Sequence, residues 1–153
     1  AWLQGLSPKE NREVPPLRYE WVYQLKRDFP ALTICLNGGV ADNDQAAAHL
    51  AHVDGVMLGR AAYQNPELLL AVDELYGAPA RTLAEVLPAI RSLLVEALGR
   101  GEMLAHYTRH LLGLFPGVRG AKQYRRILSE EARAAEAGIA VFDRALAAVG
   151  MAG

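Results

Sequence analysis

The sequence predicts an α/β fold in its first half and an all-helical fold in its second. Two short apolar runs, residues 32–36 and 53–58, each end next to glycine and are each followed by helix-type sequence. Continuous apolar runs of this length are typical of strands buried on both faces, as in parallel sheets. No β pattern appears after Leu58, so we expect the rest of the chain to be helical.

Glycines stand at the carboxyl ends of both predicted strands, in Asn37-Gly38-Gly39 and in Gly59-Arg60. In an eight-stranded α/β barrel, the loops after strands 7 and 8 form the usual phosphate site. Glycine lets backbone N–H groups approach phosphate oxygens, and arginine adds a fork of charge-assisted donors. The pattern therefore favours an α/β barrel fragment, the last strand–helix units of a TIM (β/α)8 barrel. The alternatives are a tight turn that needs positive φ at the glycines, and an ordinary surface arginine.

The other elements of the first half are predicted from the positions of proline and glycine and from the spacing of apolar residues. Residues 1–18 read as a long loop, since proline and glycine interrupt them too often for a helix. The loop carries Trp2, Lys9 and Arg12, and both a functional and a solvated loop stay open. Amphipathic spacing predicts a helix over 19–27 that ends before Pro30. Further helices are expected from an Asp42 or Asn43 cap to residue 51, as one turn over 61–64, and over 67–75.

The second half begins after a Gly- and Pro-containing segment, residues 77–81, which we interpret as a linker between 1–76 and 82–153. Thr82 and Glu85 have capping-box spacing and open a helix to about residue 98. Pro88 conflicts with that start, so either the helix kinks there or its first turn is separate. Further helices are expected over 102–115, 119–128 and about 132–149. Together they predict an all-α helical bundle domain.

Composition narrows the class of protein. The 153 residues are 52% hydrophobic with a formal net charge of −1, which suits one domain or two small ones. The single cysteine, Cys35, excludes an internal disulfide and a cysteine-only metal site, and it fits a cytoplasmic protein. No signal peptide or membrane-length apolar run is present. Two parallel strands cannot bury both their faces, so we expect this chain to be the C-terminal part of a longer protein.

The cysteine and the histidines are residue types that could be catalytic or bind a metal, but the sequence favours simpler interpretations. Cys35 lies in a predicted buried strand and is expected to be a packed small hydrophobe. His49 and His52 have no cysteine or carboxylate partner that would complete a metal set, so we interpret them as surface residues. His106 and His110 flank Arg109, which would repel a cation, and they indicate a basic surface. No metal site is predicted.

The neutral total charge hides a basic stretch. Residues 100–126 contain six Arg or Lys and one Glu. Lys122, Arg125 and Arg126 are spaced i, i+3, i+4, with Tyr124 beside them and Arg119 one turn earlier. Such a stripe is either a solvated helix face or a surface for a phosphate backbone. A solvated face is the default for such a run, but the absence of acidic residues from 119–126 argues for a phosphate-binding surface, and both interpretations stay open.

Four segments carry a resemblance to a known family. WLQGLSPKENREVPPL (2–17), NGGV (37–40), DGVMLGRAAYQNP (54–66) and YRRILS (124–129) resemble the A-type tRNA-dihydrouridine synthases. The resemblance implies an FMN-bound TIM barrel followed by a helical tRNA-binding domain. It also implies that NADPH reduces the flavin, that hydride passes to C6 of uridines 20 and 20a in the tRNA D-loop, and that a cysteine protonates C5.

The same resemblance assigns roles by motif. It implies FMN phosphate contacts at Asn37, Gly38, Gly39, Gly59 and Arg60. It implies tRNA contacts at Lys9, Arg12, Lys122 and Arg125, with Arg126 as a close competitor for the last. The family's catalytic cysteine has no counterpart at Cys35, so no catalytic residue is assigned, and the chain is expected to be inactive alone. Its expected partners are tRNA and FMN. No membrane association is expected, and the full-length protein is expected to be a monomer. A non-catalytic RNA-binding piece and another phosphate-binding flavin barrel enzyme remain as alternatives.

Overall fold

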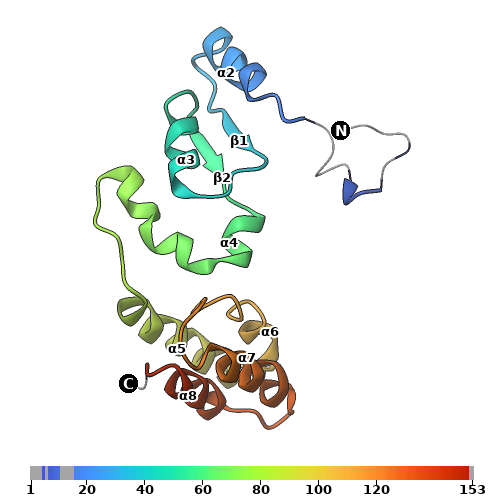
Figure 1. The fold of residues 1–153 in the computed structure, drawn as a ribbon, viewed down its shortest axis with the longest axis vertical. Coiled ribbons are helices and arrows are strands. Elements are labelled where there is room, and N and C mark those ends of the chain that lie inside the picture. Colours follow the sequence, from blue (N-terminus) through green and yellow to red (C-terminus); the bar gives the residue numbers. More distant parts are fainter. Residues whose placement is uncertain (1–4, 6, 11–15, 152–153) are drawn as a thin grey trace. The chain divides into compact units, whose positions relative to one another are not determined.

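The structure, a computed structural model, describes residues 5, 7–10 and 16–151 (Figure 1). The chain divides into two compact units, Ala1–Gly59 and Arg60–Gly153. The expected linker at 77–81 remains a prediction. In the structure this segment returns onto the residues before it, because the Arg81 N–H donates to the Leu70 carbonyl at 2.8 Å and the Arg81 guanidinium pairs with Asp73 at 3.4 Å.

Helices and strands alternate in the described part of the first unit. Its elements in order are α2 (Tyr19–Asp28), β1 (Cys35–Asn37), α3 (Asn43–Leu50) and β2 (Gly55–Met57). The two strands pair in parallel, with Leu36 opposite Val56. Both strands are shorter than the apolar runs that predicted them, but their order and direction agree with the prediction.

Asp54 extends the strand pairing on the amino-terminal side. Its N–H donates to the Ile34 carbonyl at 3.0 Å, and its carboxylate accepts the Ile34 N–H at 2.8 Å. The ammonium group of Lys26 on α2 lies 2.8 Å from the same carboxylate oxygen. The hydrogen bond from Ile34, followed by the one from Lys26, lowers the pKa of the Asp54 carboxyl. Asp54 thus ties α2 to both strands.

The core of the first unit is small. Leu36, Val40, Ala46 and Val53 are its buried aliphatic residues. The Asp42 side chain accepts the Gln45 N–H at 2.8 Å and caps α3, as the sequence indicated. This cap fixes the point at which the chain turns from the loop after β1 into the helix.

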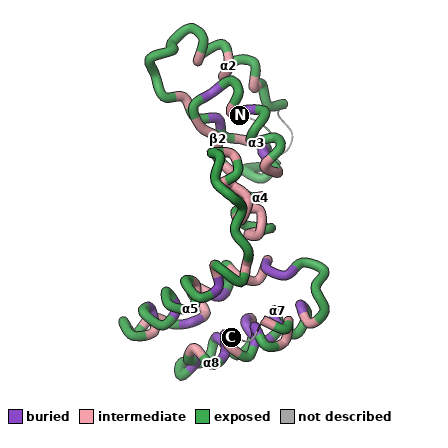
Figure 2. Tube along the Cα trace, turned by 90° about the vertical axis from the view of Figure 1, so that its left-hand side faces the viewer, coloured by how far each residue is buried: buried purple, intermediate pink, exposed green. Residues whose placement is uncertain are grey.

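All the secondary-structure elements in the described part of the second unit are helices. Its elements are α4 (Arg60–Gln64), the 3-10 helix η1 (Pro66–Tyr76), α5 (Leu83–Gly99), α6 (Ala105–Thr108), α7 (Ala121–Glu130), η2 (Glu131–Arg133) and α8 (Ile139–Ala148). Buried positions recur along α5, α7 and α8 (Figure 2), and these helices share one apolar core. Tyr124 and Phe142 are its largest fully buried side chains. No described helix is both long and apolar enough to cross a membrane.

The helix α5 begins as predicted. The Glu85 N–H donates to the Thr82 hydroxyl at 3.3 Å, and the Glu85 carboxylate accepts the Thr82 N–H at 2.7 Å, which completes the capping box. The Thr82 N–H, followed by the Thr82 hydroxyl, which donates to the same carboxylate oxygen at 2.9 Å, lowers the pKa of the Glu85 carboxyl. The helix runs through Pro88 without ending, so the first turn is not a separate piece.

The predicted ranges of two helices, 102–115 and about 132–149, are wrong. Over residues 102–115 only Ala105–Thr108 is α-helical. A Cβ on Gly113 would lie 2.8 Å from both the Gln64 carbonyl oxygen and the Pro66 ring, so this segment packs closely on the start of the unit. Phe115 then has φ 63°, and its N–H donates to the Glu67 carboxylate at 2.7 Å. These contacts replace the expected helical turns.

The helix expected over about 132–149 is divided. The chain forms the short η2 and then leaves helical geometry at Ala134, where ψ is 140°. Gly138, with ψ −177°, precedes the first residue of α8, Ile139. The alanines in this stretch have high helix propensity, but the extended backbone at these two positions interrupts the helix.

Gly120 is expected to be the glycine of the second unit that tolerates substitution least. Its φ is 90°, and a Cβ there would lie 1.8 Å from the Ala148 carbonyl oxygen of α8. Gly101 has a similar φ of 80° with open space around it, so it is a matched control. We expect G101A to lower the free energy of unfolding by about 1–2 kcal/mol. G120A should lower it by a further ~1–3 kcal/mol because of overpacking. Urea denaturation followed by circular dichroism measures both, and equal losses would contradict the close approach.

Candidate functional site

The carboxyl ends of β1 and β2 lie at the same edge of the sheet. The strands are parallel, and Asn37 is paired with Met57 at this end. The chain leaves β1 through Gly38 and Gly39, and it leaves β2 through Leu58 and Gly59. Ligands of parallel α/β folds bind outside this edge. The arrangement agrees with the edge at which the sequence predicted a phosphate site.

The Gly38–Gly39 turn has a backbone that only glycine adopts readily. The φ angles are 132° at Gly38 and 71° at Gly39. A Cβ on Gly39 would lie 2.6 Å from a Leu17 methyl carbon and 2.8 Å from the Tyr19 hydroxyl. That hydroxyl donates to the Gly38 carbonyl at 2.8 Å. The turn itself therefore requires both glycines, as the alternative interpretation of this motif stated.

The N–H groups of the same turn are available as donors. Among the described residues, neither the Gly38 nor the Gly39 N–H donates to another group of the chain. Gly39 is exposed, as is Asn37 just before the turn. Two neighbouring amide donors at an exposed glycine turn are a suitable arrangement for an anion.

The second part of the predicted phosphate motif is less constrained. Gly59 is exposed, and a Cβ there would make only ordinary contacts with Met57, at 3.8 and 3.9 Å. Arg60 is exposed and is the first residue of α4, at the start of the second unit. Its inclusion in a phosphate site rests on the sequence motif.

A cluster of tyrosine and histidine rings is connected to the glycine turn through the Tyr19 hydroxyl. His49 is buried, with 9% exposure, which corrects its interpretation as a surface residue. The Tyr23 hydroxyl is hydrogen-bonded to His49 Nδ1, and the Tyr19 ring lies 4.4 Å from the His49 ring. His52 is exposed, and its ring lies 4.3 Å from that of Tyr23. The i, i+4 spacing of Tyr19 and Tyr23 was the signal in the sequence, but it does not reveal which helix they would face.

Cys35 is exposed, which corrects the expectation of a buried side chain. Side chains alternate along β1, so Leu36 points into the core while Cys35 and Asn37 lie on the other face. The Cys35 sulfur lies beside the paired strand, where a Cβ on Gly55 would be 2.7 Å from it. Within the described ranges, no group of three or more His, Cys, Asp or Glu side chains could hold a metal ion.

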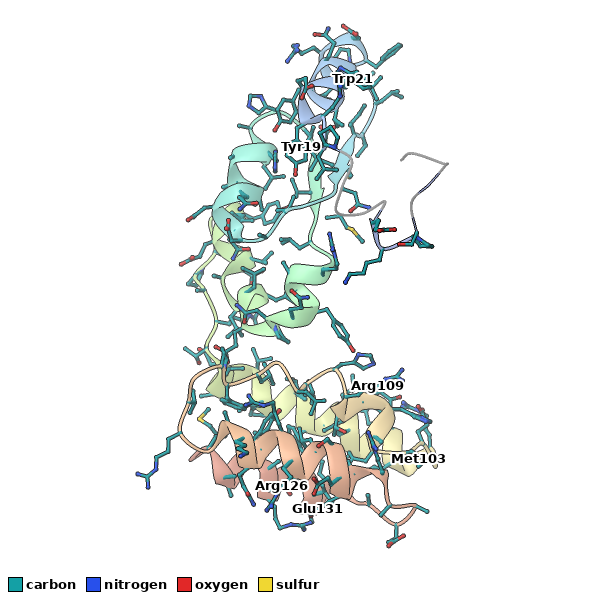
Figure 3. All side chains as sticks on the ribbon, turned by 45° about the vertical axis from the view of Figure 1, so that its right-hand side comes forward. Tyr19, Trp21, Met103, Arg109, Arg126 and Glu131 are labelled. Carbon is teal, nitrogen blue, oxygen red and sulfur yellow. The ribbon has the colours of Figure 1, made fainter. Side chains whose placement is uncertain are left out.

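The predicted cationic stripe lies on the outer face of α7. Lys122, Arg125 and Arg126 are exposed, and Arg126 is labelled in Figure 3. The opposite face of the helix is buried by Ala121, Tyr124, Ile127 and Leu128. The sequence placed Tyr124 beside the stripe on the surface, and its burial corrects that expectation. Its hydroxyl donates to the Leu111 carbonyl at 3.1 Å, and burial raises its pKa.

The stripe differs from several other arginines of its unit in having no carboxylate partner within the described residues. Four arginines elsewhere in the unit form ion pairs: Arg81 with Asp73, Arg91 with Asp143, Arg100 with Glu102, and Arg144 with Glu131. In the part of the chain that the structure describes, no carboxylate pairs with Lys122, Arg125 or Arg126. Arg126 donates to the neutral Gln123 side chain at 3.1 Å. Three positive charges on this face are left uncompensated.

The remaining predicted contact residues lie near the start of the chain. Lys9 is exposed in a turn between Ser7 and Glu10, whose side chains each accept the other's backbone N–H, at 3.3 and 2.8 Å. Arg12 and Trp2 lie outside the described residues. His106 and His110 are exposed, and His110 accepts a hydrogen bond from Arg109 at 3.0 Å, in keeping with the expected basic surface.

Comparison with known proteins identifies relatives over most of the chain. The family model described as "Dihydrouridine synthase (Dus)" matches residues 3–149. A protein of Yersinia pestis named tRNA-dihydrouridine(20/20a) synthase is 56% identical over 152 residues, which cover 97% of this chain and 44% of the relative.

Two further relatives carry the same name. The protein of Escherichia coli strain K12 is 55% identical over 150 residues, or 95% of this chain and 43% of its own length. That of Vibrio cholerae is 51% identical over 152 residues, or 97% of this chain and 46% of its own length. The chain thus spans less than half the length of these relatives. With a family model matching nearly all of its residues, the chain belongs to the dihydrouridine synthase family.

Proposed function

We propose that this chain is the phosphate-binding and tRNA-binding portion of a flavin-dependent tRNA-dihydrouridine synthase. The whole enzyme would reduce the C5–C6 bond of uridines 20 and 20a in the tRNA D-loop, with FMN as cofactor and NADPH as reductant. The observation that carries the proposal is the Gly38–Gly39 turn, in which Gly39 is exposed and two amide donors have no acceptor among the described residues. It lies at the sheet edge where parallel α/β folds bind phosphate.

The residues at this edge fit the phosphate of FMN. The Gly38 and Gly39 N–H groups would donate to its oxygens, and exposed Asn37 adds a side-chain amide at the end of β1. Gly59 and Arg60 join them by the family motif, with Arg60 supplying positive charge. Bound FMN would supply the hydride that uridine receives. The role of this chain is to hold the cofactor by its phosphate.

The exposed apolar residues of the first unit support a larger barrel. Leu17, Trp21, Leu25 and Phe29 recur every four residues along α2 and its flanks, and they are 52, 66, 46 and 53% exposed. The helix contributes no buried residue. Apolar surface of this extent is typical of a face that another element covers. We propose that further strand–helix units of a TIM barrel pack there, and that residues 82–153 form the helical domain that follows the barrel.

The cationic face of α7 is proposed to contact tRNA. Lys122, Arg125 and Arg126 present three charges without carboxylate partners, and they are held on one side by the buried face of the helix. Phosphates bind such a face through charge-assisted hydrogen bonds and release of counterions. Lys9 and Arg12 are proposed as further tRNA contacts on the basis of the family motif.

We further propose that this polypeptide does not reduce uridine by itself. Residues 1–153 contain one cysteine, Cys35. It lies within β1 against Gly55 and not in a loop at the carboxyl edge, so it is poorly placed to protonate C5 of a uridine. The proton donor would come from outside these residues.

A chimaera tests the function. Residues 1–153 replace the matching segment of the Yersinia pestis relative, which supplies the portion that the match does not cover. We expect the purified chimaera to bind FMN and, with NADPH, to form dihydrouridine in unmodified tRNA, whereas residues 1–153 alone should form none. Mass spectrometry of tRNA digests measures the product. A chimaera that folds but binds no FMN would refute the proposed function.

The phosphate loop is tested by two glycine substitutions in the chimaera. G39A forces a Cβ against Leu17 and Tyr19 at a φ of 71°, so it should displace the amide donors. We expect FMN to bind at least about 10-fold more weakly, which corresponds to ~1.4 kcal/mol. G77A is the control, because Gly77 has a similar φ of 79° with open space around it and lies outside the proposed site. Fluorescence titration measures both dissociation constants. If G39A bound FMN as well as G77A, the loop assignment would be wrong.

The tRNA surface is tested by a pair of double substitutions in the chimaera. K122A/R125A removes two charges that have no ion-pair partner, so it should weaken tRNA binding and reduce the slope of log K against log salt by about 1–2. R81A/R91A removes the same charge from arginines paired with Asp73 and Asp143. We expect this control to bind tRNA nearly as the parent does. Filter binding over a salt series measures both, and equal slopes in the two variants would reject the α7 surface.

A further inference from the structure

Tyr19 makes a hydrogen bond to the turn that the proposed function assigns to the cofactor phosphate. Its hydroxyl donates to the Gly38 carbonyl at 2.8 Å. The same oxygen would lie 2.8 Å from a Cβ on Gly39, so Tyr19 also packs against the next residue. Among described side chains, no other is hydrogen-bonded to Gly38 or Gly39. Tyr19 is thus placed to set the conformation of the turn.

The hydrogen bond fixes the direction of one amide donor. The Gly38 carbonyl and the Gly39 N–H belong to one planar trans peptide, in which they point in opposite directions. With the carbonyl held by the Tyr19 hydroxyl, the Gly39 N–H must point away from Tyr19. Gly39 is exposed, and this N–H has no acceptor within the described part of the chain. An otherwise permissive glycine peptide is therefore held with its donor directed outward.

The Tyr19 ring is itself held in place. It is half-buried and lies 4.4 Å from the ring of buried His49 on α3, at an interplanar angle of 58°. Tyr19 is the first residue of α2, so its backbone is fixed by a helix on the other side. Figure 3 labels Tyr19 and also Trp21, which is 66% exposed on the same helix. Because α2 and His49 on α3 restrict the Tyr19 ring, its hydroxyl can hold the Gly38 carbonyl in one position.

We propose that Tyr19 is a positioning residue for phosphate binding, which rests on the proposed function and extends it. Tyr19 holds the Gly38–Gly39 peptide so that the Gly39 N–H is directed at the phosphate before the cofactor arrives. It does not touch the phosphate. Its loss would leave both glycine amides present but free to rotate, and the phosphate would then have to order them.

The matched test compares two tyrosines of one helix in the chimaera. Y19F removes the hydroxyl that binds the turn, and Y23F removes a hydroxyl that binds His49 instead. We expect Y19F to bind FMN about 2- to 10-fold more weakly, as for the loss of one ordinary hydrogen bond. Its affinity for riboflavin, which lacks the phosphate, should not change. Y23F should bind both as the parent does.

The riboflavin measurement separates positioning from general damage. A structural defect would weaken both flavins, and that result for Y19F would overturn the inference, as would unchanged FMN affinity. Replacement of Tyr19 by 4-aminophenylalanine keeps a donor at the same place and should restore FMN affinity. Failure of this rescue also counts against the inference. If the parent chimaera bound FMN no better than riboflavin, the phosphate site itself would be wrong, and the inference would fall with it.

Discussion

The parallel pairing of β1 with β2 is the constraint on which the candidate site depends. Because Leu36 lies opposite Val56 in a parallel register, the loops after both strands leave the sheet at one edge. An antiparallel pairing would place the Gly38–Gly39 turn and Gly59 at opposite ends. Asp54 reinforces the pairing from the other end through its two hydrogen bonds to Ile34. The position of the turn is therefore a consequence of backbone pairing and does not depend on any one side chain at the site.

The capping signals in the sequence predicted the structure correctly, whereas several contacts between distant residues could not be predicted. The Asp42 cap and the Thr82–Glu85 capping box involve residues three apart, so their geometry is encoded in the spacing. The helix expected over 102–115 fails because Glu67, about fifty residues earlier in the chain, accepts the Phe115 N–H. His49 has surface-like spacing on α3, but two tyrosines of α2 bury it. No short window of sequence contains these contacts.

The cationic stripe illustrates a feature that composition conceals. The chain has a formal net charge of −1, and a nearly neutral total gives no sign of a polyanionic partner. The structure distinguishes the cations of the α7 stripe from the four ion-paired arginines of the second unit. Four arginines are neutralised by nearby carboxylates, while those on the outer face of α7 are not. Spacing alone predicted which residues share the face. That Tyr124 belongs to the core and not to this surface required the packing of α7 on its neighbours.

The glycines of the Asn37-Gly38-Gly39 motif carry less functional information than they suggest. Positive φ at both glycines and the close approach of Leu17 and Tyr19 to Gly39 would require these residues even in a protein that binds no phosphate. The hydrogen bonding of the turn is what indicates an anion. The Gly38 carbonyl accepts a hydrogen bond from Tyr19, whereas the Gly38 and Gly39 N–H groups have no acceptor in the described chain. Amide groups at an exposed turn can be satisfied by water, so they cost little when no ligand is bound. A turn that keeps the Gly38 carbonyl bound internally while directing the Gly39 N–H outward is selective in sign, since it offers a donor to an anion and withholds the acceptor that a cation would need.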